Sequence, residues 1–180
     1  ANITVDILSR LTVQQTAEML DRLERLNTEY ASIPRLMRCG CLQLLCHRFV
    51  EEIAHSNQTC KAKMQQTLPA LFQNRHRTAM AGYQTAQEFI AIKPTDPASY
   101  VLLTIRFREV SSSRWPVLNE EFDYAVELAE LLKERRVAGT DDRTMQLVVL
   151  DGAKLALQDS MQATENLLET QAQHVVAPLN

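Results

Sequence analysis

Glycine and proline are scarce in this chain, and their scarcity constrains the fold more than any other feature of the sequence. Only four Gly and six Pro occur among 180 residues. The long stretches between them carry apolar residues at intervals of three and four, which places those side chains on one face of an α-helix. We therefore predict an all-α protein, folded as an antiparallel bundle of five or six helices.

Length and composition are those of one ordinary domain. With 180 residues, 46% of them hydrophobic, the chain can bury a continuous core. We predict a single helical-bundle domain over residues 1–180. The segment 111–116, Ser-Ser-Ser-Arg-Trp-Pro, is the clearest loop and the one place where a domain hinge is expected.

The first two long helices are expected on either side of Pro34. The first helix is expected to begin either near residues 4–6 or at Thr12, where Thr12 and Gln15 have the spacing of a capping box. The second helix is expected to begin at Pro34 and to be the most buried. It is either interrupted at residues 56–58 or continues towards Thr67, and a new helix is expected to start at residues 67–69. Its apolar stripe consists of Cys39, Leu42, Cys46, Phe49 and Ile53.

The remaining helices are less uniform in pattern. Residues 100–110 alternate like a strand, but Asp96 and Pro97 look like a helix cap and first residue, and we favour a helix. Asn119 is expected to cap the next helix, and a last one follows Gly139. Its heptad positions are Leu147, Leu150, Lys154, Leu157, Met161, Thr164 and Leu168. The charged Lys154 in this seam either specifies the oligomeric state or extends outward.

The two halves of the chain carry opposite charge. Residues 1–93 hold 11 Lys or Arg and 8 Asp or Glu, a net charge of +3, whereas residues 94–180 hold 8 and 14, a net charge of −6. Such asymmetry can steer a partner of opposite sign, including the acidic half of another copy. Nucleic acid is the less favoured partner.

The cysteines and the amino terminus indicate a reducing compartment. Four Cys lie between residues 39 and 60, too far apart on a helix for a disulfide, so we expect small buried thiols. They do not have zinc-ligand spacing, and we predict no metal and no cofactor. No apolar run approaches the roughly 20 residues needed to cross a bilayer. The amino terminus lacks a signal-peptide layout, so we predict a cytoplasmic protein without a membrane partner.

Arg48 and His55 lie seven residues apart on one predicted helical face. This spacing resembles the Arg-x4-6-His signature of HEPN-type ribonucleases, helical bundles that dimerise to bring two such motifs around a phosphate. The resemblance implies that Arg48 stabilises phosphate charge and that His55 takes part in proton transfer. Phe49 stands where those motifs usually carry a polar residue. A solvated ladder of Arg48 with Glu52 and Glu51 with His55 explains the same residues.

Further basic residues are candidate binding residues. Arg75, His76 and Arg77 either form an anion-binding patch or place His76 as a hydrogen-bonded core residue. A second group comprises Arg106, Arg108, Arg114 and Trp115. The run through residues 93–107, followed by two helices, is similar to rod-shaped plant virus coat proteins, which implies an RNA-binding subunit.

The sequence favours a non-catalytic function. Wide apolar arcs, heptad seams and opposite charges in the two halves are typical of a protein-interaction bundle, either self-associating or acting as an adaptor or chaperone for a helical partner. We predict a protein partner, with a homo-oligomer favoured. The alternatives are the ribonuclease bundle and the coat-like subunit.

Overall fold

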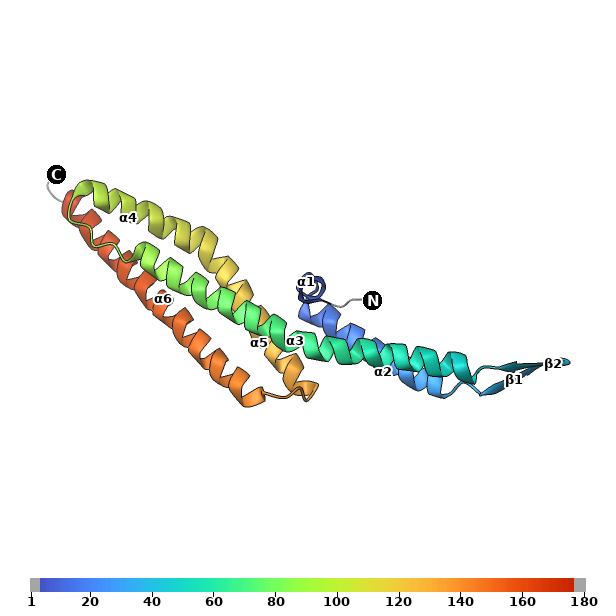
Figure 1. Ribbon diagram of the computed structural model, residues 1–180. Coiled ribbons are helices and arrows are strands. Elements are labelled where there is room, and N and C mark those ends of the chain that lie inside the picture. Colours follow the sequence, from blue (N-terminus) through green and yellow to red (C-terminus); the bar gives the residue numbers. More distant parts are fainter. Residues whose placement is uncertain (1–3, 177–180) are drawn as a thin grey trace. The chain divides into compact units, whose positions relative to one another are not determined.

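The computed structural model describes residues 4–176, with side chains described as far as residue 171. Over this range the chain is mostly helical and has a small two-stranded sheet, which confirms the all-α prediction in its broad form. The elements, shown in Figure 1, are α1 (Val5–Leu8), α2 (Val13–Ala31), β1 (Leu36–Cys39), β2 (Leu42–Leu45), α3 (His47–Ile90), α4 (Pro97–Glu109), the π-helical turn η1 (Val110–Arg114), α5 (Trp115–Glu134) and α6 (Thr140–Val176). No helix among the described residues is both long and apolar enough to span a bilayer.

The chain divides into two compact units, each of which is described by itself. Unit 1 comprises Ala1–Phe72 and Glu130–Val137, and unit 2 comprises Gln73–Ala129 and Ala138–Asn180. The helices α3 and α5 therefore contribute residues to both units. The single domain expected over residues 1–180 stays a prediction.

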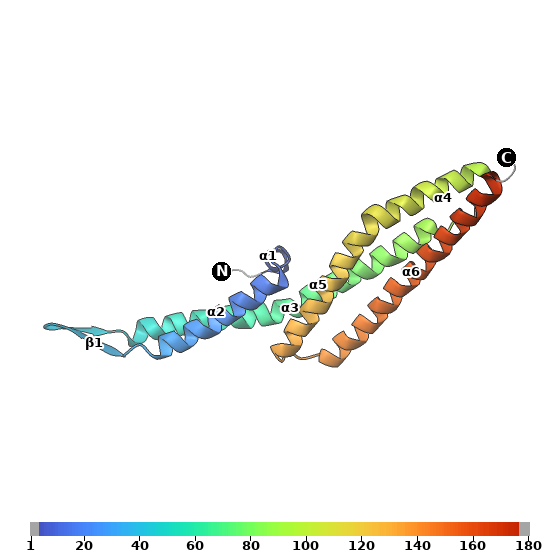
Figure 2. The same ribbon diagram turned by 180° about the vertical axis from the view of Figure 1, so that it is seen from behind.

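In unit 1 a β-hairpin joins α2 to α3. The predicted capping box at the start of α2 is confirmed, because Thr12 and Gln15 each accept a hydrogen bond from the other's backbone N–H. The helix α2 then lies beside the first part of α3 (Figures 1 and 2). An ion pair of 2.7 Å joins Lys61 of α3 to Glu24 of α2.

The core of unit 1 lies away from the hairpin. Its buried side chains are Leu8, Val13, Thr16, Leu20, Met64, Leu68, Leu71, Phe72, Leu131 and Leu132. Between residues 21 and 63 no side chain is buried. The prediction that the segment after Pro34 is the most buried is therefore wrong. Arg135, just after α5, still pairs with Asp21 and Glu24 at the start of this stretch. Closer to the hairpin α2 and α3 lie against each other alone (Figures 1 and 2), which leaves each apolar stripe at best half covered.

In unit 2, the second part of α3 runs in the same direction as α6. Near its start Gln73 donates a hydrogen bond to Gln146 (2.9 Å), and further along Gln87 donates one to Ser160 (3.2 Å). Because both residue numbers increase together, the two helices are parallel to each other. Their side-by-side course is visible in Figure 2.

The continuous helix formed by α4, η1 and α5 runs in the opposite direction. At its beginning Tyr100 donates a hydrogen bond to the carbonyl of Leu168, late in α6 (2.9 Å). Further along, Phe122 contacts Lys154, which is earlier in α6. The core of unit 2 lies between these helices and consists of Ala79, Tyr83, Ala86, Ile90, Leu103, Val110, Leu118, Ala125, Leu128, Ala129, Leu150 and Leu157.

Residues 36–45 form a β-hairpin, which corrects the helix predicted from Pro34. The two strands pair antiparallel, with Leu36 opposite Leu45 and Cys39 opposite Leu42. Gly40 has φ of +62°, and Cys41 does not have a positive φ. A glycine with positive φ in the first position of a two-residue loop is the pattern of a type II′ turn, whose twist matches that of paired strands. The turn at Gly40 therefore determines a hairpin here, although the spacing of the apolar residues also fits a helix.

The break predicted at residues 67–69 is wrong, because α3 continues through Pro69. A proline inside a helix removes one hydrogen bond and costs about 3 kcal/mol. Beside it Leu68, Leu71 and Phe72 are almost completely buried. Burying each such side chain contributes about 1.5–3 kcal/mol, so packing outweighs the cost of the proline.

The loop predicted at residues 111–116 is also wrong, because η1 joins α4 to α5 without leaving the helical path. A π turn accommodates one extra residue, and Ser112 Oγ donates to the carbonyl of Arg108 at 2.6 Å. Asn119, predicted as a cap, therefore lies inside α5. The helix favoured for residues 100–110 is confirmed as α4, where Asp96 accepts a hydrogen bond from the N–H of Ser99 (2.7 Å).

Candidate interaction surfaces

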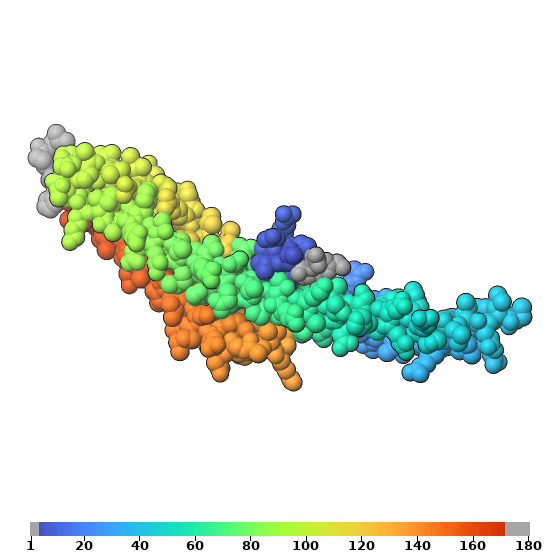
Figure 3. Space-filling model, in the orientation of Figure 1, coloured from blue at the N-terminus to red at the C-terminus, as the bar shows by residue number. Residues whose placement is uncertain are grey.

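The β-hairpin exposes large apolar side chains on both of its faces. Every residue of β1 and β2 is exposed, and in unit 1 the hairpin projects beyond the ends of α2 and α3 (Figures 1 and 3). We call the exposed apolar side chains of this segment the hairpin surface. It consists of Leu36, Met37, Leu42, Leu44, Leu45 and Phe49, with exposed fractions from 40% for Leu36 to 72% for Leu45.

The strand register divides the hairpin residues between its two faces. Neighbouring strand residues point to opposite sides, and Met37 lies opposite Leu44 while Cys39 lies opposite Leu42. These four residues share one face, which is apolar throughout. An isolated two-stranded ribbon is only marginally stable in water, so a partner that covers this face would also stabilise the hairpin.

The cysteines do not have the buried positions that we predicted. Cys39 and Cys41 are exposed on either side of Gly40, and Cys46 and Cys60 are half-buried; all four are free thiols. Two of the residues expected inside a helix therefore lie at the tip of the hairpin, because the chain reverses at Gly40.

Positive charge surrounds the hairpin surface. Arg35, Arg38 and Arg48 are all exposed. No Asp or Glu occurs in the sequence between Glu29 and Glu51. The basic character predicted for the amino-terminal half is thus concentrated next to its most exposed apolar side chains.

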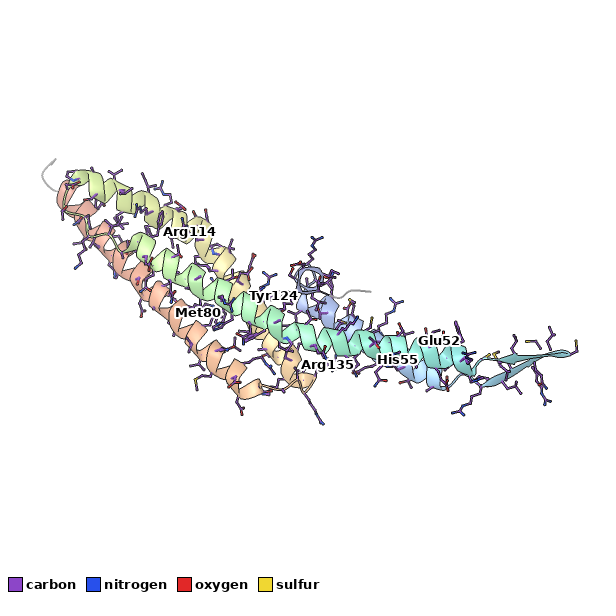
Figure 4. The ribbon with its side chains drawn as sticks, in the orientation of Figure 1. Glu52, His55, Met80, Arg114, Tyr124 and Arg135 are labelled. Carbon is purple, nitrogen blue, oxygen red and sulfur yellow. The ribbon has the colours of Figure 1, made fainter. Side chains whose placement is uncertain are left out.

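Arg48 and His55 lie on the first turns of α3, and both side chains are exposed. Figure 4 shows His55 and Glu52 on these turns. A spacing of seven residues places Arg48 and His55 on the same face of the helix. The ribonuclease role that the resemblance implies stays a prediction.

The basic residues predicted at the start of unit 2 contact side chains of the same unit. Arg75 Nη1 donates to Glu121 Oε1 at 2.6 Å, and its guanidinium lies 4.6 Å from the centre of the Tyr124 ring. Burial raises the pKa of Tyr124, although Arg75 acts against this shift. His76 Nε2 lies 3.0 Å from the carbonyl of Gln146, which is the hydrogen-bonded position expected of a core histidine. Arg77 is exposed.

Two of the arginines predicted as binding residues, Arg106 and Arg114, contact the same aromatic ring, that of Phe89. The guanidinium carbons of Arg106 and Arg114 lie 4.7 and 4.2 Å from the centre of the Phe89 ring. Arg114, labelled in Figure 4, also pairs with Glu109 at 2.6 Å. Arg108 is exposed. The guanidinium groups of Arg106 and Arg114 therefore stabilise unit 2 through cation–π contacts.

Trp115 packs edge-on against Tyr83, with ring centroids 6.4 Å apart. It also lines an open surface hollow of about 320 Å³ together with Gln158 and Met161. Burial, with smaller contributions from two carboxylates, raises the pKa of Tyr83 to about 12. Its hydroxyl donates to the carbonyl of Leu118 at 3.0 Å, so this tyrosine is a neutral structural donor.

Lys154 does not extend into solvent from the last heptad seam. Its ammonium lies 4.1 Å from the centre of the Phe122 ring, and the residue is half-buried. A lysine in this position gains a cation–π contact while its stem packs against apolar neighbours. The structure thus gives Lys154 a partner within unit 2.

Sequence reasoning missed a second apolar stripe on α6. Four large apolar residues on this helix are more than half exposed: Met145, Val148, Val149 and Leu155. Together with Gly152 they recur at intervals of three and four, and we call them the outer stripe. The signal was present in the sequence as a second set of heptad positions beside the buried Leu150 and Leu157.

Comparison with known proteins found no matching family model, no similar curated protein and no similar solved structure. Among the described residues, no group of three or more His, Cys, Asp or Glu side chains is arranged to hold a metal ion. The hairpin surface and the outer stripe are therefore the candidate functional surfaces of this chain.

Proposed function

We propose that this chain is a non-catalytic protein-interaction protein that self-associates, with the hairpin surface as a binding surface. The observation that carries the proposal is a β-hairpin whose apolar side chains are exposed on both faces. Contiguous exposed apolar side chains mark binding surfaces in soluble proteins. An adaptor or chaperone that binds a helical partner would use the same surface.

The free energy available for association depends on how many apolar side chains a partner can cover. A fully buried Leu, Met or Phe contributes about 1.5–3 kcal/mol relative to an exposed one. The six residues of the hairpin surface are already partly covered. Covering the remainder contributes about 1 kcal/mol each, a total of about 6 kcal/mol from apolar burial alone. In a single copy Leu42 and Leu45 stay exposed, so they stabilise its fold much less than they would stabilise a complex that buries them.

We infer further that the helices pack as a bundle in which consecutive helices are antiparallel. The opposite directions of α5 and α6 in unit 2 support this, since Phe122 meets Lys154 while Tyr100 meets Leu168. The parallel pair formed by α3 and α6 is what three successive antiparallel helices produce. Such a bundle supplies a rigid base for exposed binding residues.

The test is self-association with and without the apolar hairpin face. Leu42→Thr combined with Leu44→Thr keeps strand propensity while removing two exposed leucines. Light scattering coupled to size-exclusion chromatography should show that the mass of the wild type rises with concentration. The hairpin double variant should stay monomeric at the same concentrations.

A matched control changes two other exposed apolar side chains. Val101 and Ile105 lie one turn apart on α4 and are more than half exposed. Val101→Gln combined with Ile105→Gln should leave the mass profile of the wild type unchanged. The proposal is refuted if the wild type stays monomeric throughout, or if the hairpin variant associates as strongly as the wild type.

A further inference from the structure

The helix α6 is apolar on two sides, and only one of them is covered. Leu150 and Leu157 are fully buried on the side that faces the core of unit 2. On the other side the outer stripe exposes Met145 (66%) and Val148 (63%). A helix that is apolar on both sides is normally covered on both. The outer stripe is therefore the second surface that a partner can cover.

The middle of the outer stripe allows close approach. Gly152 is exposed, and a Cβ added there would meet no atom within 4 Å. Because glycine has no side chain, a partner can approach the backbone of α6 closely between Val148 and Leu155, which lie on the same helical face. Figure 3 shows α6, in orange to red, at the surface.

Negative charge borders the outer stripe. Asp141 lies one turn before Met145, and Asp159 lies one turn after Leu155; both carboxylates are exposed. Asp142 and Asp151 are also exposed on this helix. The two Lys or Arg residues of α6 contact unit 2 itself, since Arg143 donates to the carbonyl of Ala138 (2.7 Å) and Lys154 lies over Phe122.

The two exposed apolar surfaces thus have opposite charges at their borders. Around the hairpin surface stand Arg35, Arg38 and Arg48, whereas carboxylates border the outer stripe. Pairing two hairpins would bring arginines together, and pairing two outer stripes would bring carboxylates together. Like charges placed face to face are unfavourable, so only the unlike pairing matches both charge and apolar character.

The two surfaces also match in length. A strand of four residues, as in β1 or β2, spans about 13 Å. The outer stripe from Met145 to Leu155 spans about 16 Å along the helix. The apolar face of the hairpin can therefore cover most of the stripe. Arg38 lies on the opposite face of the hairpin, opposite Gln43, so Arg35 and Arg48 are the arginines that this pairing places next to the bordering carboxylates.

We propose that the hairpin surface of one copy binds the outer stripe of α6 in a second copy. This inference rests on the self-association proposed above and names the two surfaces that meet. The contact is heterologous, because each copy contributes a different surface and keeps the other one for a further neighbour. Such contacts produce rings when the rotation closes and open chains when it does not.

The decisive experiment mixes two variants that each lack one surface. The hairpin variant, Leu42→Thr with Leu44→Thr, keeps the outer stripe. A stripe variant, Val148→Gln with Leu155→Gln, keeps the hairpin. Each alone should be monomeric, whereas an equal mixture should form a one-to-one dimer, because only one pair of intact surfaces is present. Circular dichroism should show the helical content of the wild type in both.

Charge reversal provides an independent measurement. Arg35→Glu and Asp159→Lys should each weaken the association of the wild type at least tenfold at low salt, and the loss should shrink as salt is raised. Asn166→Lys, which adds positive charge further along α6, is the matched control and should have a smaller effect.

The outcomes separate the two proposals. If the stripe variant associates like the wild type, or if the mixture stays monomeric while the wild type associates, the pairing with α6 is overturned and self-association through the hairpin remains. If the hairpin variant associates like the wild type, the role of the hairpin is overturned as well. A wild type that stays monomeric at every concentration overturns both.

Discussion

Gly82 and Gly152 provide a paired test of packing in unit 2, because both lie inside long helices but in different surroundings. A Cβ added at Gly82 would fall inside contact distance of Leu118 Cδ2, whereas one added at Gly152 would meet nothing within 4 Å. Leu118 is almost fully buried, and its carbonyl accepts a hydrogen bond from Tyr83 at 3.0 Å. A methyl group at residue 82 must therefore displace the Leu118 side chain from its buried position.

Two opposing effects determine whether a Gly→Ala substitution raises or lowers the free energy of unfolding. Replacing Gly by Ala inside a helix stabilises by about 1 kcal/mol through backbone propensity. Forcing an extra methyl group into a packed core destabilises by about 1–3 kcal/mol. Gly152→Ala should therefore raise the free energy of unfolding by about 1 kcal/mol, and Gly82→Ala should lower it by about 1 kcal/mol.

Urea denaturation at low protein concentration measures the free energy of unfolding of both variants. The gain from helix propensity is the same in both, so the difference between them reports only the crowding at residue 82. In a Leu118→Ala background the crowding is removed, and Gly82→Ala should then stabilise by about 1 kcal/mol. If Gly82→Ala stabilises the wild type as much as Gly152→Ala does, the close packing of α3 against α5 at this point is refuted.

Three further substitutions test single contacts. Thr12→Ala removes a capping box and should lower the free energy of unfolding by about 1 kcal/mol, measured by calorimetry with Thr12→Asn as the retained cap. Burial raises the pKa of Tyr83 from 10.0 to about 12, so the unfolded chain loses this proton first and the free energy of unfolding should fall between pH 10 and pH 12. Urea titrations of Tyr83→Phe should show a smaller fall, because Tyr124, whose pKa burial also raises, still contributes to it. Lys154→Met keeps the apolar stem but loses the contact with Phe122, and should cost about 0.5–1 kcal/mol in thermal denaturation.

Local signals in the sequence predicted several elements correctly. The capping box at Thr12, the helix that follows Asp96 and the buried heptad positions Leu150 and Leu157 are all found in the structure. Each of these depends on residues within one or two turns of one another. Such patterns remain informative because the neighbours that determine them are close in the chain.

The failures share a different cause, which is competition between a local signal and packing. Pro69 and Asn119 carry strong local signals for a helix end and a helix start. Both lie inside continuous helices in the structure. Conversely, Gly40 forms a turn at a place where the spacing of the surrounding apolar residues predicts a helix. A single sequence does not state which of the two effects is larger at each position.

The same limit applies to the candidate surfaces, and it bears directly on function. An interval of three or four residues shows that side chains share a helical face, but not that a neighbouring element covers that face. On α6 one such face is buried at Leu150 and the other is exposed at Val148. Near the hairpin, Leu42 and Phe49 fit the stripe of a buried helix and are more than half exposed. An apolar pattern without an internal neighbour is what an assembling protein requires, so the residues that sequence analysis assigned to a core are those most useful for testing association.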